Sequence, residues 1–331
     1  MHRSLGATIL MACSYALCAR ASEGLPSDAA RLREKLRVVQ VPCTTGAAAQ
    51  PARFYAPSTR PCPRPLVVHL HTWSGDYLQD GSALGVLEEC VRRGWAFIQP
   101  NYRGPNQQPE ACASPQAVQD VLDAVEFACS QTAIDRKRIY AVGNSGGGHM
   151  ALVMAARAPD VWAGVSAWSA ITDLAAWHRE SVQRGNRYAK DMENVCGGAP
   201  GTSPEADREY RERSSLWFLA NAKGLPVDIG VGIHDGYTGS VPVHHGLWAF
   251  NALAEANGLP DKRLTDTQIA TFTDRQAVPA ELRGERRNEP CRTYTMLFQR
   301  SVGPSRITVF EGGHSIDIRA AMRWLARQQK P

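Results

Sequence analysis

Ser145 has the flanking residues of a nucleophilic serine. It lies in residues 143–147, which read G-x-S-x-G. The apolar, β-branched residues 139–142 predict a buried strand before it, and residues 150–156 predict a helix after it. A serine with small neighbours between a strand and a helix can occupy the strained turn that exposes its hydroxyl. We therefore predict that Ser145 is a catalytic nucleophile.

A serine hydroxyl needs a base to take its proton and a third group to orient that base. His314 follows the last predicted strand in the sequence Gly-Gly-His-Ser and is the predicted base. Asp235 ends the predicted strand at residues 227–233 and is the predicted acid. Asp173, after the strand that follows the serine turn, is the alternative acid. Ser145, Asp235 and His314 also stand in the chain order expected for a triad on a strand–helix sheet.

Acyl transfer further requires N–H donors aimed at the developing oxyanion. The N–H of Gly146, directly after the nucleophile, is the first predicted donor. The second should come from the loop after the third predicted strand, at residues 71–76, where Trp73 or Thr72 is the candidate. The Trp73 side chain would then either form a wall of the acyl site or pack elsewhere.

Four residues near the predicted acid raise the question of a metal. His234, Asp235, His244 and His245 lie close together in the sequence. They have neither the H-E-x-x-H pattern nor any comparable ligand spacing. We therefore predict no metal site, and the serine mechanism requires no cofactor.

The elements that must position these residues alternate along the chain. Strand and helix patterns at this interval predict an α/β fold with a mostly parallel, doubly wound sheet flanked by helices. The predicted strands are residues 36–41, 52–56, 65–71, 95–99, 139–142, 161–167, 227–233, 293–298 and 306–310. The predicted helices are residues 28–37, 84–93, 117–128, 150–156, 247–257 and 320–326.

Two stretches interrupt this alternation. Residues 171–224 are polar and contain tryptophan, and they predict a helical cap inserted into the domain. Residues 259–292 form a second polar, arginine-rich insertion. The last two strand patterns flank Gly303-Pro304 and predict either a hairpin or two neighbouring strands. We expect a single domain over residues 22–331.

Composition excludes some functions. The 331 residues are 44% apolar and 21% charged, with a formal net charge of +5. These values suit one large globular domain, and no basic run is long enough to suggest nucleic acid.

The N-terminus predicts export. Residues 1–21 contain His2 and Arg3, an apolar run and an Ala-Arg-Ala site, which is the pattern of a secretory signal peptide cleaved before Ser22. A lipid anchor on Cys13 is the lesser alternative, and so is a helix packed on the domain. No other apolar run approaches the ~20 residues of a membrane span. The oligomeric state does not follow from the sequence.

Nine cysteines occur in the chain. Cys43 with Cys62, or Cys196 with Cys291, could form bridges between loops in an oxidising compartment. None has the spacing of a zinc or redox site, so no cysteine chemistry is expected.

Residues 66–325 resemble the α/β-hydrolase superfamily, and within it the catalytic domain of the prolyl oligopeptidase family and its esterase relatives. The resemblance implies the α/β-hydrolase fold and a serine triad. In that family the acid usually lies two or three residues before the Val of the Val-Pro pair, where this chain has Thr238 and Gly239; Asp235 lies six residues before Val241. The matching stretches are Pro-Asn-Tyr-Arg-Gly at 100–104, Asp-Val-Leu-Asp at 120–123, Ile-Asp at 134–135, Arg-Ile at 138–139, Arg-Ser-Ser-Leu at 213–216 and Ser-Val-Pro-Val at 240–243.

The resemblance also bounds the substrate. The peptidases of this group owe their selectivity to a β-propeller, and the stretch before the third predicted strand is too short for one. A compact exported hydrolase with a cap resembles secreted carboxylesterases, including acetyl and feruloyl esterases acting on plant polysaccharide. A peptidase for short peptides and a non-catalytic binding protein are the alternatives. Aromatic side chains that would either stack on sugars or fill the core are Trp162, Trp168, Trp177 and Trp217.

Overall fold

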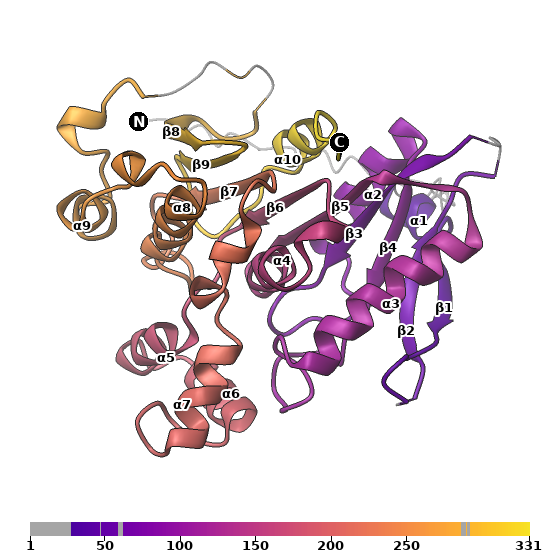
Figure 1. Ribbon diagram of the computed structural model, residues 1–331, viewed down its shortest axis with the longest axis horizontal. Coiled ribbons are helices and arrows are strands. Elements are labelled where there is room, and N and C mark those ends of the chain that lie inside the picture. The colour runs from indigo at the N-terminus through magenta and orange to yellow at the C-terminus, as the bar shows by residue number, and fades with distance from the viewer. Residues whose placement is uncertain (1–27, 47, 59–61, 286–288, 290–291) are drawn as a thin grey trace, which may run out of the picture.

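The computed structural model describes residues 28–46, 48–58, 62–285, 289 and 292–331 (Figure 1). The predicted signal peptide at residues 1–21, the alternative anchor Cys13 and the cysteine Cys291 lie outside the described residues. No helix in these described ranges is long and apolar enough to cross a bilayer.

One sheet runs through the middle of the molecule. The described residues form nine strands in the order β1-β2-β4-β3-β5-β6-β7-β9-β8. The pairs from β4 to β9 are parallel, and the strands at both edges are antiparallel to their neighbours. The strands are β1 (Arg37–Val41), β2 (Gln50–Tyr55), β3 (Arg64–Leu70), β4 (Ala96–Pro100), β5 (Ile134–Asn144), β6 (Gly164–Trp168), β7 (Val227–Gly232), β8 (Met296–Val302) and β9 (Ser305–Phe310).

Helices cover both faces of this sheet (Figure 1). Alternate residues of β3 show why: Leu66 and Val68 pack into one core cluster and Val67 into the other, and all three are fully buried. The first cluster includes α3 (Pro115–Gln131), α4 (Gly146–Arg157) and α8 (His244–Ala256). The second includes α2 (Gly81–Arg93) and α10 (Ile318–Leu325). The predicted doubly wound α/β arrangement is therefore confirmed.

Local sequence signals define the helix ends. The Ser114 hydroxyl accepts a hydrogen bond from the Ala117 N–H, and Pro115 occupies the first turn of α3. Gly94 ends α2 in a left-handed conformation, with φ of 70°.

The stretch at residues 171–224 folds into α5 (Leu174–Gln183), α6 (Tyr188–Cys196) and α7 (Pro204–Glu212), which group together at the lower left of Figure 1. Their apolar side chains form a third cluster that also contains Trp73 from the main domain. The stretch at residues 259–292 contains α9 (Asp266–Asp274). The cap thus packs against Trp73 in the loop that follows β3, and also against Cys112 and Val241.

Some boundaries and one bridge differ from the sequence predictions. The first helix, α1 (Asp28–Arg33), ends four residues early because β1 begins at Arg37. The last two strands form an antiparallel hairpin in which β9 is the inner strand. Cys43 and Cys62 carry free thiols, so the bridge considered between them is wrong.

Candidate active site

Ser145 lies on the turn that joins β5 to α4. Its φ of 60° and ψ of −123° are a strained conformation for a residue with a side chain. The Ser145 N–H donates to the Trp168 carbonyl oxygen at 2.9 Å, which fixes the turn to the end of β6. A Cβ on Gly147 would overlap the Leu70 carbonyl oxygen, so the close approach of the turn to β3 requires glycine there.

The loop after β3 lies against this turn. A Cβ on Gly146 would overlap the Trp73 backbone nitrogen and lie 2.5 Å from the Trp73 Cα. The Thr72 N–H donates to Gln79 Oε1 at 2.8 Å. Within the described residues the Trp73 N–H has no acceptor, and it lies beside Gly146, the first residue of α4. Of the two residues considered from the sequence, Trp73 is therefore the one with a free donor near Gly146.

His314 and Asp235 form a hydrogen-bonded pair. His314 Nδ1 lies 2.8 Å from Asp235 Oδ2, and the Asp235 side chain is buried. Asp235 Oδ1 accepts from the N–H groups of Gly236 at 2.9 Å and Val241 at 3.2 Å. An ionised carboxylate accepts, so Nδ1 carries the proton and Nε2 is left with a lone pair. Such an imidazole can take a proton from a hydroxyl.

The loop that carries Asp235, here called the acid loop, packs closely against this pair. A Cβ on Gly239 would overlap Asp235 Oδ1 and lie 2.5 Å from the His314 Cβ. Gly239 is one of the two positions where the family pattern has its acid. A side chain at that position would displace the pair, so this loop requires glycine where the family pattern has a carboxylate.

Strand order brings the three residues to one edge. Ser145 follows β5, Asp235 follows β7 and His314 follows β9, and β5, β6, β7 and β9 are parallel neighbours. The carboxyl ends of parallel strands meet at the same edge, where ligands bind in open α/β sheets.

Asp173, the alternative acid, has another partner. Its carboxylate accepts from the Ala176 N–H at 3.0 Å and caps the N-terminus of α5. The geometry therefore favours Asp235.

The four residues that raised the question of a metal are separated. Asp235 binds His314, while His234 lies 2.7 Å from Gln276 Oε1 and 2.6 Å from Glu311 Oε1. His244 and His245 instead face Glu180 on α5.

The cap supports both loops of the site through contacts that the sequence did not predict. The buried indole of Trp73 donates to Asp191 Oδ2 at 3.1 Å and packs edge-on against Trp177, with ring centres 4.7 Å apart. Trp177 Nε1 donates to the carbonyl oxygen of Ser240 in the acid loop at 2.8 Å. Arg187 donates to Ser74 Oγ at 2.6 Å. No motif signals such contacts, because their partners lie far apart in the chain.

The tryptophans considered as sugar-stacking residues are mostly packing residues. Trp162, Trp168 and Trp177 are buried, and Trp217 is 49% exposed beneath the Arg211 guanidinium. Tyr237, two positions after Asp235 in the chain, has an aromatic side chain that is 56% exposed.

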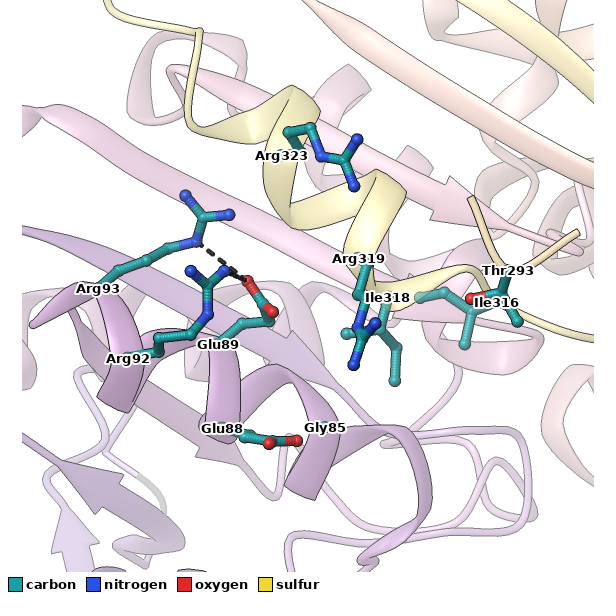
Figure 2. A pocket seen from close by; sticks show the side chains of 10 residues that line it. All are labelled: Gly85, Glu88, Glu89, Arg92, Arg93, Thr293, Ile316, Ile318, Arg319 and Arg323. Carbon is teal, nitrogen blue, oxygen red and sulfur yellow. Dashed lines mark hydrogen bonds and ion pairs between the residues drawn. The ribbon is translucent and has the colours of Figure 1, made fainter. Parts of the chain in front are cut away.

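A cavity of about 610 Å³ lies away from these residues, between α2 and α10. Figure 2 shows Arg92 and Arg93 beside Glu89 on α2, with Arg319 and Arg323 on the facing helix. Ser145, Asp235 and His314 are not among its lining residues. This cavity is therefore separate from the candidate triad at the strand edge.

Comparison with known proteins agrees with this architecture. The family model described as "Prolyl oligopeptidase family" matches residues 86–276. The poly(3-hydroxybutyrate) depolymerase of Ralstonia pickettii is 32% identical over 134 residues, which cover 34% of this chain and 27% of the depolymerase. This chain thus spans only a small part of that curated relative.

Solved structures share the fold at low identity. The acylaminoacyl peptidase of Pyrococcus horikoshii has a TM-score of 0.57 at 16% identity, covering 88% of this chain and 40% of the peptidase. A puromycin-hydrolyzing peptidase of Mycobacterium tuberculosis has a TM-score of 0.56 at 18% identity, covering 88% and 37%. A thermostable esterase has a TM-score of 0.55 at 16% identity, covering 91% and 64%. These likenesses confirm the α/β-hydrolase fold, and this chain spans less than two thirds of each of the three.

Proposed function

The chain belongs to the prolyl oligopeptidase family, and from that premise we propose that it is a secreted serine hydrolase that cleaves carboxylic esters through an acyl-enzyme. The observation that carries the proposal is the 2.8 Å hydrogen bond between His314 Nδ1 and Asp235 Oδ2 at the strand edge that also presents Ser145. It leaves His314 Nε2 unprotonated and oriented.

In the proposed reaction, Ser145 Oγ attacks the ester carbonyl carbon while His314 Nε2 accepts the hydroxyl proton. The N–H groups of Gly146 and Trp73 donate to the oxyanion of the tetrahedral intermediate. His314 returns the proton to the leaving alcohol, which leaves Ser145 acylated. Water then attacks the acyl-enzyme with His314 again as base, and the acid and free serine are released. Asp235 holds the imidazole and stabilises its charged form throughout.

Ester cleavage is favoured over amide cleavage by the similarity to a depolymerase whose name denotes a polyester substrate. We propose acetyl or feruloyl esters of plant polysaccharide as the substrate class. The exposed ring of Tyr237 beside the acid loop supports this choice, because aromatic faces stack on sugar rings. Export by a signal peptide at residues 1–21 is part of the same proposal, since polysaccharide lies outside the cell.

The second candidate is a peptidase for short peptides, which the family itself favours. An aryl acetate and an Xaa-Pro aryl amide separate the two candidates. The ester proposal predicts turnover of the acetate and none of the amide, because an esterase without a clamp for a peptide N-terminus should not cleave the amide. Turnover of the amide alone would contradict it. A protein that neither turns over esters nor reacts with a fluorophosphonate would instead be a binding protein on a hydrolase fold.

A further inference from the structure

Two histidines and a glutamate meet between the cap and the main domain. His244 Nε2 lies 2.7 Å from Glu180 Oε1, and His245 Nε2 lies 3.1 Å from Glu180 Oε2. Glu180 is on α5, and both histidines are in the first turn of α8. The His245 side chain is fully buried, while those of His244 and Glu180 are 14% and 17% exposed.

These side chains offer the ligands of a divalent transition metal. One ligand atom from each residue lies within 4.8 Å of the others. Imidazole nitrogen and carboxylate oxygen are the donors that Zn²⁺ takes in three-residue sites. The two imidazole rings have centres 5.0 Å apart. Imidazoles bound to one Zn²⁺ at about 2.0–2.1 Å and a tetrahedral angle have ring centres about 5 Å apart, so the spacing of the ring centres suits one ion, and the nitrogen and carboxylate oxygen atoms would separate from their hydrogen-bond distances to admit it.

Thr172 contacts the second ring nitrogen of His245. The Thr172 N–H donates to His245 Nδ1 at 3.3 Å, and Thr172 Oγ1 lies 3.2 Å from the same nitrogen and donates to the His245 carbonyl oxygen at 3.0 Å. Ligation through Nε2 would move the His245 proton to Nδ1, where Thr172 Oγ1 can accept it in place of the long contact with the Thr172 N–H. Trp248 packs on both imidazoles, with ring centres 4.3 Å and 5.2 Å away.

We propose that Glu180, His244 and His245 bind one Zn²⁺ ion that joins the cap helix α5 to α8. The partial exposure of His244 and Glu180 leaves room for water as a fourth ligand. Trp177 lies one turn before Glu180 and contacts the acid loop through Ser240, so the ion would hold α5 against the loop that carries Asp235. This inference does not depend on the proposed function.

The test measures metal binding by the full chain rather than catalysis. The protein is stripped with a chelator, dialysed against Zn²⁺ and analysed for bound metal, with calorimetry for the affinity. We expect one equivalent bound with a Kd of about 1 µM or tighter, and a higher melting temperature with Zn²⁺ than with chelator. Co²⁺ in its place should give the visible absorption of a tetrahedral site with nitrogen and oxygen ligands.

Three variants distinguish a metal site from a hydrogen-bonded histidine pair. Glu180→Gln and His244→Ala should each weaken Zn²⁺ binding by at least about 100-fold. His234→Ala removes a histidine that also contacts a glutamate but has no second histidine beside it, so its affinity should match that of the unaltered protein. Glu180→Gln changes the shape least and keeps the test valid if His244→Ala fails to fold. Substoichiometric metal in the unaltered protein, or equal binding by all three variants, would overturn the proposal.

Discussion

The backbone N–H of Trp73 lies beside Gly146, so closely that a Cβ on Gly146 would overlap the Trp73 nitrogen. This contact joins the loop after β3 to the serine turn. It brings the Trp73 N–H next to the residue that follows Ser145 in the chain. The Thr72 N–H is held by Gln79, so Trp73 supplies the loop's free donor.

Gly146→Ala should impair catalysis through this contact. The added methyl group must push the Trp73 backbone away, which misaligns both oxyanion donors. We expect kcat for an aryl acetate to fall by about 10²–10³-fold with a much smaller change in KM. Gly164→Ala is the control, because the atoms nearest to its Cβ belong to the side chains of Gln328, at 3.1 Å, and Leu325, at 3.4 Å, rather than to a backbone. Equal effects of the two changes would show that the contact has no special role.

Asp235→Asn should identify the acid. Asparagine donates where the carboxylate accepts, so His314 would be held in the wrong tautomer, and kcat should fall by about 10⁴-fold. Asp173→Asn should leave both activity and stability near those of the unaltered protein, because asparagine caps a helix as well as aspartate. If the larger loss follows Asp173→Asn, the assignment of Asp235 is wrong.

Tyr237→Ala should separate polymer binding from ester chemistry. The ring is exposed and lies outside the proposed reacting groups, so turnover of an aryl acetate should be unchanged. The kcat/KM for a feruloylated or acetylated polysaccharide should fall by about 10-fold, the loss of one stacking contact of about 1.4 kcal/mol. Trp217→Ala is the control, because it removes another exposed aromatic side chain that lies farther from Asp235 in the chain, and it should change neither activity. An unchanged ratio of the two activities would exclude Tyr237 from polymer recognition.

Stability should decline in mild acid. Burial, with the charge of His245, lowers the pKa of His149 from 6.5 to about 3. Between these values the unfolded state binds a proton that the folded state does not, so stability is complete above about pH 6.5 and is lost as the pH falls toward 3. One such histidine accounts for about 2 kcal/mol between pH 7 and pH 5. Urea unfolding at several pH values measures the free energy of unfolding. His149→Gln should reduce its decline between pH 7 and pH 5 by about 2 kcal/mol. An unchanged decline would contradict the assignment of this effect to His149.

Periodicity predicted the fold well, because buried parallel strands and the helices between them leave clear apolar patterns. The strand predicted at residues 65–71 corresponds to β3, which is buried along its whole length. The predicted end of the helix at residues 84–93 coincides with the end of α2, where Gly94 stops it. The first helix was predicted too long, since no such signal stands between it and β1.

The candidate site residues were predictable from the sequence where their chemistry requires particular neighbouring residues. The small residues around Ser145 follow from the turn, and the position of His314 after the last strand follows from topology. The cap contacts of Trp73 with Asp191 and of Trp177 with Ser240 were not predictable, because they join segments far apart in the chain. Glu180 was missed as a partner of His244 and His245 for the same reason.

The central claim is that Ser145 is the nucleophile, and labelling with a fluorophosphonate tests it most directly. The unaltered protein should be labelled at Ser145, as located by peptide mass spectrometry, and should lose aryl acetate turnover as the label accumulates. Ser145→Ala should take up no label, lose at least about 10⁴-fold in kcat and keep its unfolding midpoint. Labelling at another residue, or undiminished turnover by a folded Ser145→Ala protein, would contradict the account.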